Sequence, residues 1–304
     1  MTNFGLNYIE LIRELEQMSE HKRLERIRHF GVSLSIFNKN YDELHHHLTI
    51  HNTPRISLAL MGQEKRHLLH AYQIEITRFL HNYIASSLSL VDHTRNHYRE
   101  LYGNNDLFPD YQVQIDIRFK NHPLSVFIKD LRQYLQHYQM PGLSSRLVYK
   151  KDAPDFEMTI RMGVADLNKF SGWKSKSKEY ISSFEDDIDL MSLVKEYHEH
   201  VNEFYQWFIG RQMEIHKDDI EKVDLHKKKI RDNEFMRFVS ELITQPKSIE
   251  DFEHDLFKFY DEDELEFIRN SQSTGERIKN ILTILQNEAL FNEEAEKAVK
   301  NVYK

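Results

Sequence analysis

Between residues 122 and 139 the chain reads HPLSVFIKDLRQYLQHYQ. Its apolar side chains recur at helical spacing, and at 100° per residue they fall within about 60° of one line. They are Leu124, Phe127, Ile128, Leu131, Tyr134, Leu135 and Tyr138. Pro123 suits the first turn of a helix, and Met140-Pro141-Gly142 suits its end. The pattern therefore predicts an amphipathic helix over residues 122–139 that buries one face.

A longer helix is predicted ahead of this one. Residues 64–102 contain neither Pro nor Gly, and their apolar residues recur at helical spacing. At a rise of 1.5 Å per residue this helix is roughly 58 Å long, so other helices should pack along it. The same spacing predicts further helices at residues 6–30 (ending near Gly31), 32–48 and 176–215, with two or three more within 218–304.

Two segments carry alternating apolar and polar residues, which is a strand pattern. Residues 144–164 predict a β-hairpin around the turn at residues 152–155. Residues 111–119 also alternate, but they follow Pro109 and fit either a strand or a helix.

The predicted fold class is mainly α: a helical bundle with long helices and a small antiparallel β-hairpin. We expect a helical bundle with an inserted hairpin over residues 1–215, and an acidic helical region over 216–304 that is either separate or a continuation.

Composition supports this fold class and excludes several functions. Gly (9) and Pro (6) are about 5% of the 304 residues, well below the usual ~12%. The absence of cysteine excludes disulfides, thiolate metal sites and cysteine nucleophiles. No apolar run reaches the ~18 residues of a membrane span, so we expect a cytoplasmic protein without membrane contact.

Several common catalytic motifs are missing. The sequence has no glycine-rich phosphate loop, no dinucleotide fingerprint, no GxSxG elbow and no HExxH motif. The tract His45-His46-His47 is expected to be surface histidine, because adjacent helical side chains point about 100° apart. We predict no cofactor and no metal.

Charge is distributed unevenly along the chain. The net charge is −8 overall and −6 over residues 216–304. Residues 111–178 instead carry twelve basic and six acidic residues, a net charge of +6. Such a segment either attracts a polyanion such as RNA or is ordinary solvated surface.

Arg132 and His137 lie in this basic segment with four residues between them. Three Arg and His pairs with four to six intervening residues occur in the chain, about as many as chance predicts. The pair Arg23/His29 lies in a strongly charged segment, and Arg211/His216 follows a glycine at a predicted helix break. Only Arg132/His137 lies on a clearly amphipathic helix after a long helix.

The segment Asp130-Leu131-Arg132-Gln133-Tyr134-Leu135-Gln136-His137-Tyr138 resembles the HEPN (higher eukaryote and prokaryote nucleotide-binding) family. Ribonuclease members of that family carry Arg-x(4–6)-His on a helix of a small bundle. The residue after Arg is polar there and often Asn, whereas this chain has Gln133. The resemblance covers residues 64–140.

This resemblance implies metal-independent RNA cleavage. His137 would act as general base or acid on the ribose 2′-hydroxyl, since histidine exchanges protons near neutral pH. Arg132 would stabilise charge on the scissile phosphate through its planar donor fork. Asp130 or Gln133 would hold the imidazole in one tautomer. A toxin or phage-defence role, with a partner such as an antitoxin, follows by analogy with the family.

The basic segment supplies further candidates, and geometry raises the question of a dimer. Lys129 and Arg146 could hold the RNA backbone.

Measured from Leu131, Arg132 lies at about +100° and His137 at about −120°, so they flank the apolar face without converging. In the family, two copies of the motif meet at a dimer interface, and we therefore expect a homodimer. The alternatives are a non-catalytic helical scaffold and a nucleic-acid-binding protein that does not cleave.

Overall fold

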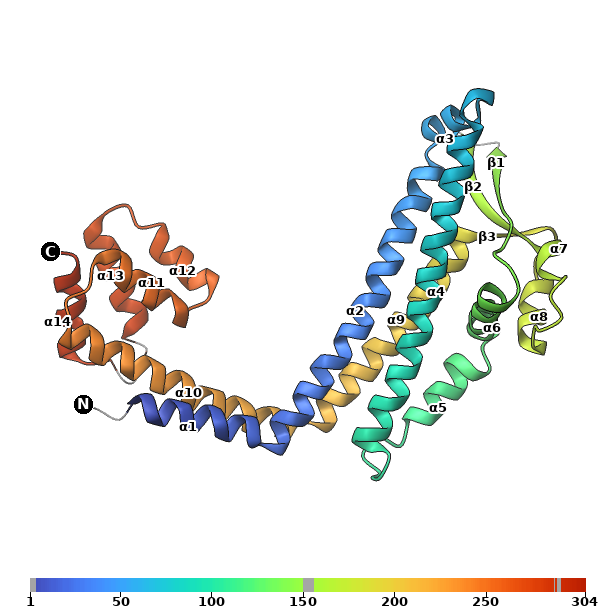
Figure 1. The fold of residues 1–304 in the computed structure, drawn as a ribbon. Helices are drawn as coiled ribbons and strands as arrows, with labels where there is room; N and C mark the ends of the chain where they lie inside the picture. The colour runs from blue at the N-terminus through green and yellow to red at the C-terminus, as the bar shows by residue number, and fades with distance from the viewer. Residues whose placement is uncertain (1–3, 150–155, 287, 289–290) are drawn as a thin grey trace. The chain divides into compact units, whose positions relative to one another are not determined.

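The computed structural model describes residues 4–149, 156–286, 288 and 291–304. It is mainly helical with one small sheet, which confirms the predicted fold class (Figure 1). The chain divides into two compact units. The central unit is Glu25–His216, and the terminal unit combines Met1–Leu24 with Lys217–Lys304. Within the described ranges, no helix has both the length and the apolar character that a membrane span requires.

Three long helices form the body of the central unit and lie side by side (Figure 1). They are α2 (Ser19–Asn52, within this unit from Glu25), α4 (Arg66–Tyr102) and α9 (Leu190–Ile215). Phe37 of α2, Tyr83 of α4 and Tyr197 of α9 pack together, with ring centroids 5.2–6.5 Å apart. The long helix predicted at 64–102 is confirmed as α4.

Gly31 does not end a helix, contrary to expectation, because α2 continues through it to Asn52. A glycine inside a helix costs only about 1 kcal/mol relative to alanine. The neighbouring Phe30 and Phe37 are buried, and each contributes about 1.5–3 kcal/mol by leaving water. Burial of the aromatic side chains therefore outweighs the local preference of the glycine.

The ambiguous segment after Pro109 is helical. It forms α5 (Tyr111–Ile115) and then one turn of π-helix, η2 (Asp116–Lys120). The backbone N–H of Asn121 donates to the carbonyl of Asp116, five residues earlier. Tyr111 is buried and stacks on Tyr98 of α4 at 3.8 Å, which fixes the segment as a helix against α4.

Smaller elements complete the central unit. The helices are α3 (Pro54–Met61), η1 (Gln63–Lys65), α6 (Pro123–His137), α7 (Val164–Leu167) and α8 (Ser175–Ser182). The strands β1 (Leu143–Tyr149), β2 (Phe156–Gly163) and β3 (Asp187–Asp189) form an antiparallel sheet in the order β1-β2-β3. The predicted hairpin is present as β1 and β2, and its predicted turn at 152–155 lies outside the described residues.

The helix predicted over 176–215 is interrupted at residues 183–189, where β3 separates α8 from α9. Asp187 of β3 accepts from Arg146 of β1 (2.7 Å) and from Arg161 of β2 (2.5 Å). Asp189 caps α9 by accepting from the backbone N–H of Ser192. Asp187 binds partners that are distant in sequence, so helical periodicity does not detect the break.

The terminal unit has its own core. Its helices are α1 (Phe4–Gln17), α10 (Lys217–Thr244), α11 (Ile249–Leu256), η3 (Phe257–Phe259), α12 (Glu262–Arg269), α13 (Thr274–Leu285) and α14 (Glu293–Val302). The buried Phe235, Phe238 and Phe252 belong to this core. The boundary expected at 215/216 lies one residue from the structural boundary. Residues 1–24, however, join the terminal unit, where Arg23 makes a bidentate ion pair with Asp219 (2.7 and 2.8 Å).

His198 of α9 makes the stability of the central unit depend on pH. Its ring stacks on Tyr41 at 3.5 Å, and burial lowers its pKa to about 4, although Asp42 opposes the shift. Between pH 6.5 and about 4 the unfolded chain binds a proton at this position and the folded chain does not. Stability therefore falls as pH decreases through this window.

We predict that His198→Gln reduces this pH sensitivity. Wild type should lose about 2 kcal/mol more unfolding free energy than the variant between pH 7.5 and pH 5, because one pKa unit corresponds to ~1.4 kcal/mol. Urea unfolding followed by tryptophan fluorescence measures this, since Trp173 and Trp207 both lie in the central unit. His46→Gln, at an exposed site on α2, is the control and should behave as wild type. Equal losses in wild type and His198→Gln would contradict the prediction.

Candidate functional site

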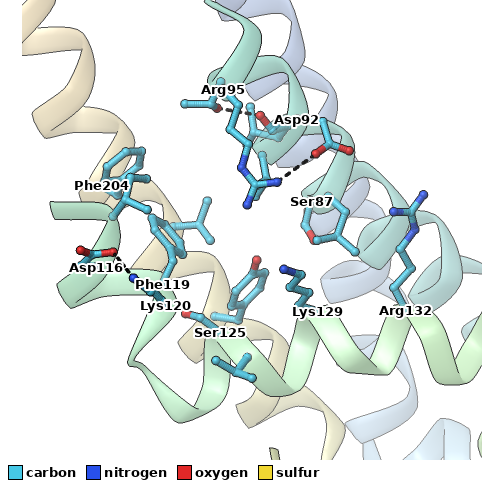
Figure 2. A pocket seen from close by; sticks show the side chains of 18 of the residues that line it. Ser87, Asp92, Arg95, Asp116, Phe119, Lys120, Ser125, Lys129, Arg132 and Phe204 are labelled. Atoms are coloured by element: carbon cyan, nitrogen blue, oxygen red, sulfur yellow. Dashed lines mark hydrogen bonds and ion pairs between the residues drawn. The ribbon is translucent and has the colours of Figure 1, made fainter. Parts of the chain in front are cut away.

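A cavity of about 770 Å³ lies inside the central unit, bordered by α4, α5, η2, α6 and α9. Figure 2 shows many of its lining side chains. The volume is within the ~300–1,000 Å³ range of small-molecule sites. Five cations line it, against two carboxylates. The cations are Arg95, Lys120, Lys129, Arg132 and Lys174, and the carboxylates are Asp92 and Asp116.

Helix α6 contributes one continuous polar face to this cavity. Its opposite face is buried, as Leu124, Phe127, Ile128, Leu131, Tyr134 and Leu135 show, while Tyr138, just beyond the helix, stays exposed. Lys129, Arg132, Gln133, Gln136 and His137 recur every three or four residues and all line the cavity. Burial of the apolar face therefore determines which side chains α6 turns toward the cavity.

Arg132 and His137 consequently border the same cavity in a single chain. They stand at the two margins of the polar face, as the predicted angles require, and the cavity is wide enough to reach both. His137 is exposed at the last residue of α6, whereas Arg132 is half-buried. A site shared between two copies of the chain is therefore not needed to place Arg132 and His137 in the same cavity.

The cations of the cavity differ in how they are paired. Arg95 contacts Asp92 and Lys120 contacts Asp116, each at 3.3 Å. Over the described residues, by contrast, neither Lys129 nor Arg132 makes an ion pair. The Nε of Arg132 is shielded from solvent without any hydrogen-bond acceptor among the described protein atoms. Leaving such a buried donor unsatisfied costs about 1–3 kcal/mol, and a bound anion would remove that cost.

The other two Arg and His pairs of similar spacing have a different environment. Arg23 is bound to Asp219, and Arg211 is bound to Glu214 at 2.9 Å. His216 is buried and contacts Tyr102. Arg132 is thus the one arginine of the three whose guanidinium is not already neutralised by a described carboxylate.

The remaining predicted site residues have separate positions. Gln133 lines the cavity beside Arg132. Arg146 lies on β1, outside the cavity lining, and its guanidinium binds Asp187. Arg146 thus links β1 to β3 through Asp187 and is not one of the cavity residues.

Asp130 is not positioned to orient His137, which corrects the expectation from sequence. It is buried, and its Oδ2 accepts from the backbone N–H of Lys174 (3.0 Å) and from the hydroxyl of Ser177 (2.7 Å). The Nζ of Lys174 lies 3.3 Å from its Oδ1. Asp130 thus anchors the start of α8 and the cavity residue Lys174.

The floor of the cavity is aromatic and uncharged. Burial raises the pKa of Tyr111 to about 12 and that of Tyr197 to about 12, so both phenols remain protonated near neutral pH. Tyr205 is also buried, and its hydroxyl shares a hydrogen bond with Thr94 at 2.5 Å. These groups can donate hydrogen bonds or pack against a ligand, but they do not serve as bases.

The contributions of α4, η2 and the segment before α8 do not follow from the sequence patterns described above. Ser87, Val91 and Arg95 share one face of α4, and that spacing is the signal for Arg95. In that helix His93 binds Ser33 and His97 binds Gln212. Within the described residues no three His, Asp or Glu side chains are grouped as a metal would require.

The chain was compared with protein-family models, with curated proteins and with solved structures, and none of them matches it. Function must therefore be inferred from the cavity itself.

We predict that Asp130→Ala destabilises the central unit by about 1–3 kcal/mol, because the Lys174 N–H and the Ser177 hydroxyl lose their buried acceptor. Asp130→Asn keeps an acceptor oxygen and should lose less. Urea unfolding followed by the fluorescence of Trp173 measures both, since this ring packs against α6. Wild-type stability in Asp130→Ala would contradict the anchoring role.

Proposed function

We propose that the central unit binds RNA in this cavity and cleaves it without a metal ion, through Arg132 and His137, in the cytoplasm. One observation carries the proposal: α6 presents Lys129, Arg132 and His137 to one cavity, and no described carboxylate neutralises Arg132. An unpaired, half-buried guanidinium favours a phosphate ligand, because its planar fork matches two phosphate oxygens.

The proposed reaction uses the 2′-hydroxyl of RNA as nucleophile. His137 removes the proton from this hydroxyl, and the resulting oxygen attacks the adjacent phosphorus. The bond from phosphorus to the 5′ oxygen breaks, leaving a 2′,3′-cyclic phosphate, and the 5′ oxygen takes a proton from water. Arg132 stabilises the additional negative charge on the phosphate oxygens, and Lys129 holds the neighbouring backbone.

A homodimer, a partner such as an antitoxin and a toxin or phage-defence role belong to this proposal through the resemblance to HEPN ribonucleases. The cavity itself is lined by one chain. A dimer would therefore add a second, equivalent site.

RNA binding without cleavage is the second candidate. It is favoured by the surroundings of His137, because no described side chain donates to or accepts from its imidazole. Catalytic histidines are usually oriented by such a partner. A general base contributes about 10²–10⁴-fold to a rate, so the two candidates differ by a measurable amount.

We predict that purified protein cleaves single-stranded RNA in EDTA, and that Arg132→Ala and His137→Ala each reduce the rate at least ~100-fold. Arg146→Ala is the matched control, because this arginine lies outside the cavity lining and should leave the rate within about twofold. Gel analysis of a labelled RNA, with urea unfolding of each variant, measures both effects.

RNA binding separates the outcomes. Salt-dependent binding that Lys129→Ala weakens, without product, would replace the nuclease with the binding candidate. Equal cleavage by all variants would place the activity elsewhere. If the protein neither binds nor cleaves RNA, both candidates are contradicted.

A further inference from the structure

The cavity has two chemically different ends. Figure 2 shows Phe119 and Phe204 together on one side, next to the ion pair of Lys120 with Asp116, and Lys129 and Arg132 on the other. The guanidinium of Arg95 points into the space between them. A ligand with a flat, apolar group at one end and negative charge at the other would therefore match this space.

The aromatic end is held in place by the π-helical turn. Phe119 of η2 packs edge-on against Phe204 of α9, with ring centroids 5.0 Å apart. The carbonyl of Arg118 accepts from the hydroxyl of Ser125 (3.1 Å) and from the imidazole of His200 (2.6 Å). Phe204 is buried, whereas Phe119 is half-buried and lines the cavity, so the ring of Phe119 is available to a ligand.

The size of the cavity excludes a bare phosphate as its natural occupant. A volume of about 770 Å³ suits a molecule the size of a nucleotide, and a single anion would leave the aromatic end empty. Nucleobases stack on Phe, and phosphates bind Arg and Lys.

We propose that the cavity binds one nucleotide, with its base against Phe119 and its phosphate on Lys129 and Arg132. The nucleotide is either a residue of a single-stranded RNA or a free nucleotide, since both share this chemistry. The first form rests on the proposed ribonuclease function, whereas the second does not.

Isothermal titration calorimetry on the full chain tests the pocket with small probes that contain no scissile bond. The probes are AMP, CMP, adenosine, ribose 5-phosphate and inorganic phosphate. At least one of the two mononucleotides should bind about tenfold more tightly than ribose 5-phosphate, because the sugar phosphate lacks the base. Adenosine should also bind more weakly than AMP, because it lacks the phosphate.

Two substitutions locate the two ends. Phe119→Leu should weaken mononucleotide binding at least about fivefold and leave ribose 5-phosphate unchanged, since stacking contributes to the base alone. Phe267→Leu is the control, because Phe267 is an exposed phenylalanine of the terminal unit. Arg132→Ala should weaken mononucleotides and ribose 5-phosphate alike. Urea unfolding of Phe119→Leu verifies that the central unit is folded.

Mononucleotide binding and RNA cleavage are measured separately, so the nucleotide pocket and the ribonuclease can be contradicted independently. Mononucleotide binding without RNA cleavage would support the pocket and contradict the nuclease. RNA cleavage with no preference for AMP or CMP over ribose 5-phosphate would overturn the nucleotide pocket and leave the nuclease. Displacement of the mononucleotide by single-stranded RNA would assign the pocket to the RNA chain, and RNA binding without displacement would assign it to a free nucleotide.

Discussion

Helix α6 buries one face completely and thereby fixes the direction of the other. Phe127 and Tyr134 pack against Trp173, and Leu124, Ile128 and Leu131 are also buried. Each such side chain contributes about 1.5–3 kcal/mol by leaving water, so rotation of the helix about its axis is strongly opposed. The orientation of Lys129, Arg132 and His137 toward the cavity is therefore a consequence of core packing. This orientation does not require Lys129, Arg132 or His137 to make polar contacts of their own.

The surroundings of α6 supply what the helix alone cannot. Helices α5 and α9 provide the buried tyrosines of the floor, α4 adds hydroxyl groups and the Arg95–Asp92 pair, and η2 brings Phe119 and Lys120 to the same space. Asp130 is not one of the lining residues; it binds the start of α8 and the lining residue Lys174. The result combines positive charge with aromatic surface, and nucleotides have the complementary chemistry.

Much of this fold follows from periodicity in the sequence. The helix at 64–102, the amphipathic helix at 122–139 and the hairpin could be predicted because each buries a face with a regular repeat. The continuation of α2 through Gly31 could not be predicted from periodicity, and neither could the strand β3. Both depend on contacts between residues that are distant in sequence. Phe30 and Phe37 override a glycine, and Asp187 binds arginines of the two preceding strands.

The candidate site was predictable only in part, for the same reason. The polar face of α6 can be read from its sequence, including Lys129, Arg132, Gln133 and His137. The role of Asp130 could not be read from the sequence, because its partners Lys174 and Ser177 lie more than 40 residues away. The position of Phe119 also does not follow from the sequence, since a single π-helical turn has no recognisable repeat.

On the proposed function, the unpaired guanidinium of Arg132 binds RNA phosphate inside the cavity. A crystal structure of the full chain with a 2′-O-methyl oligonucleotide tests it most directly, because this RNA analogue lacks the attacking hydroxyl. We expect a phosphate within hydrogen-bond distance of Arg132 and a base against Phe119. An oligonucleotide bound elsewhere, with the cavity unchanged, would contradict it.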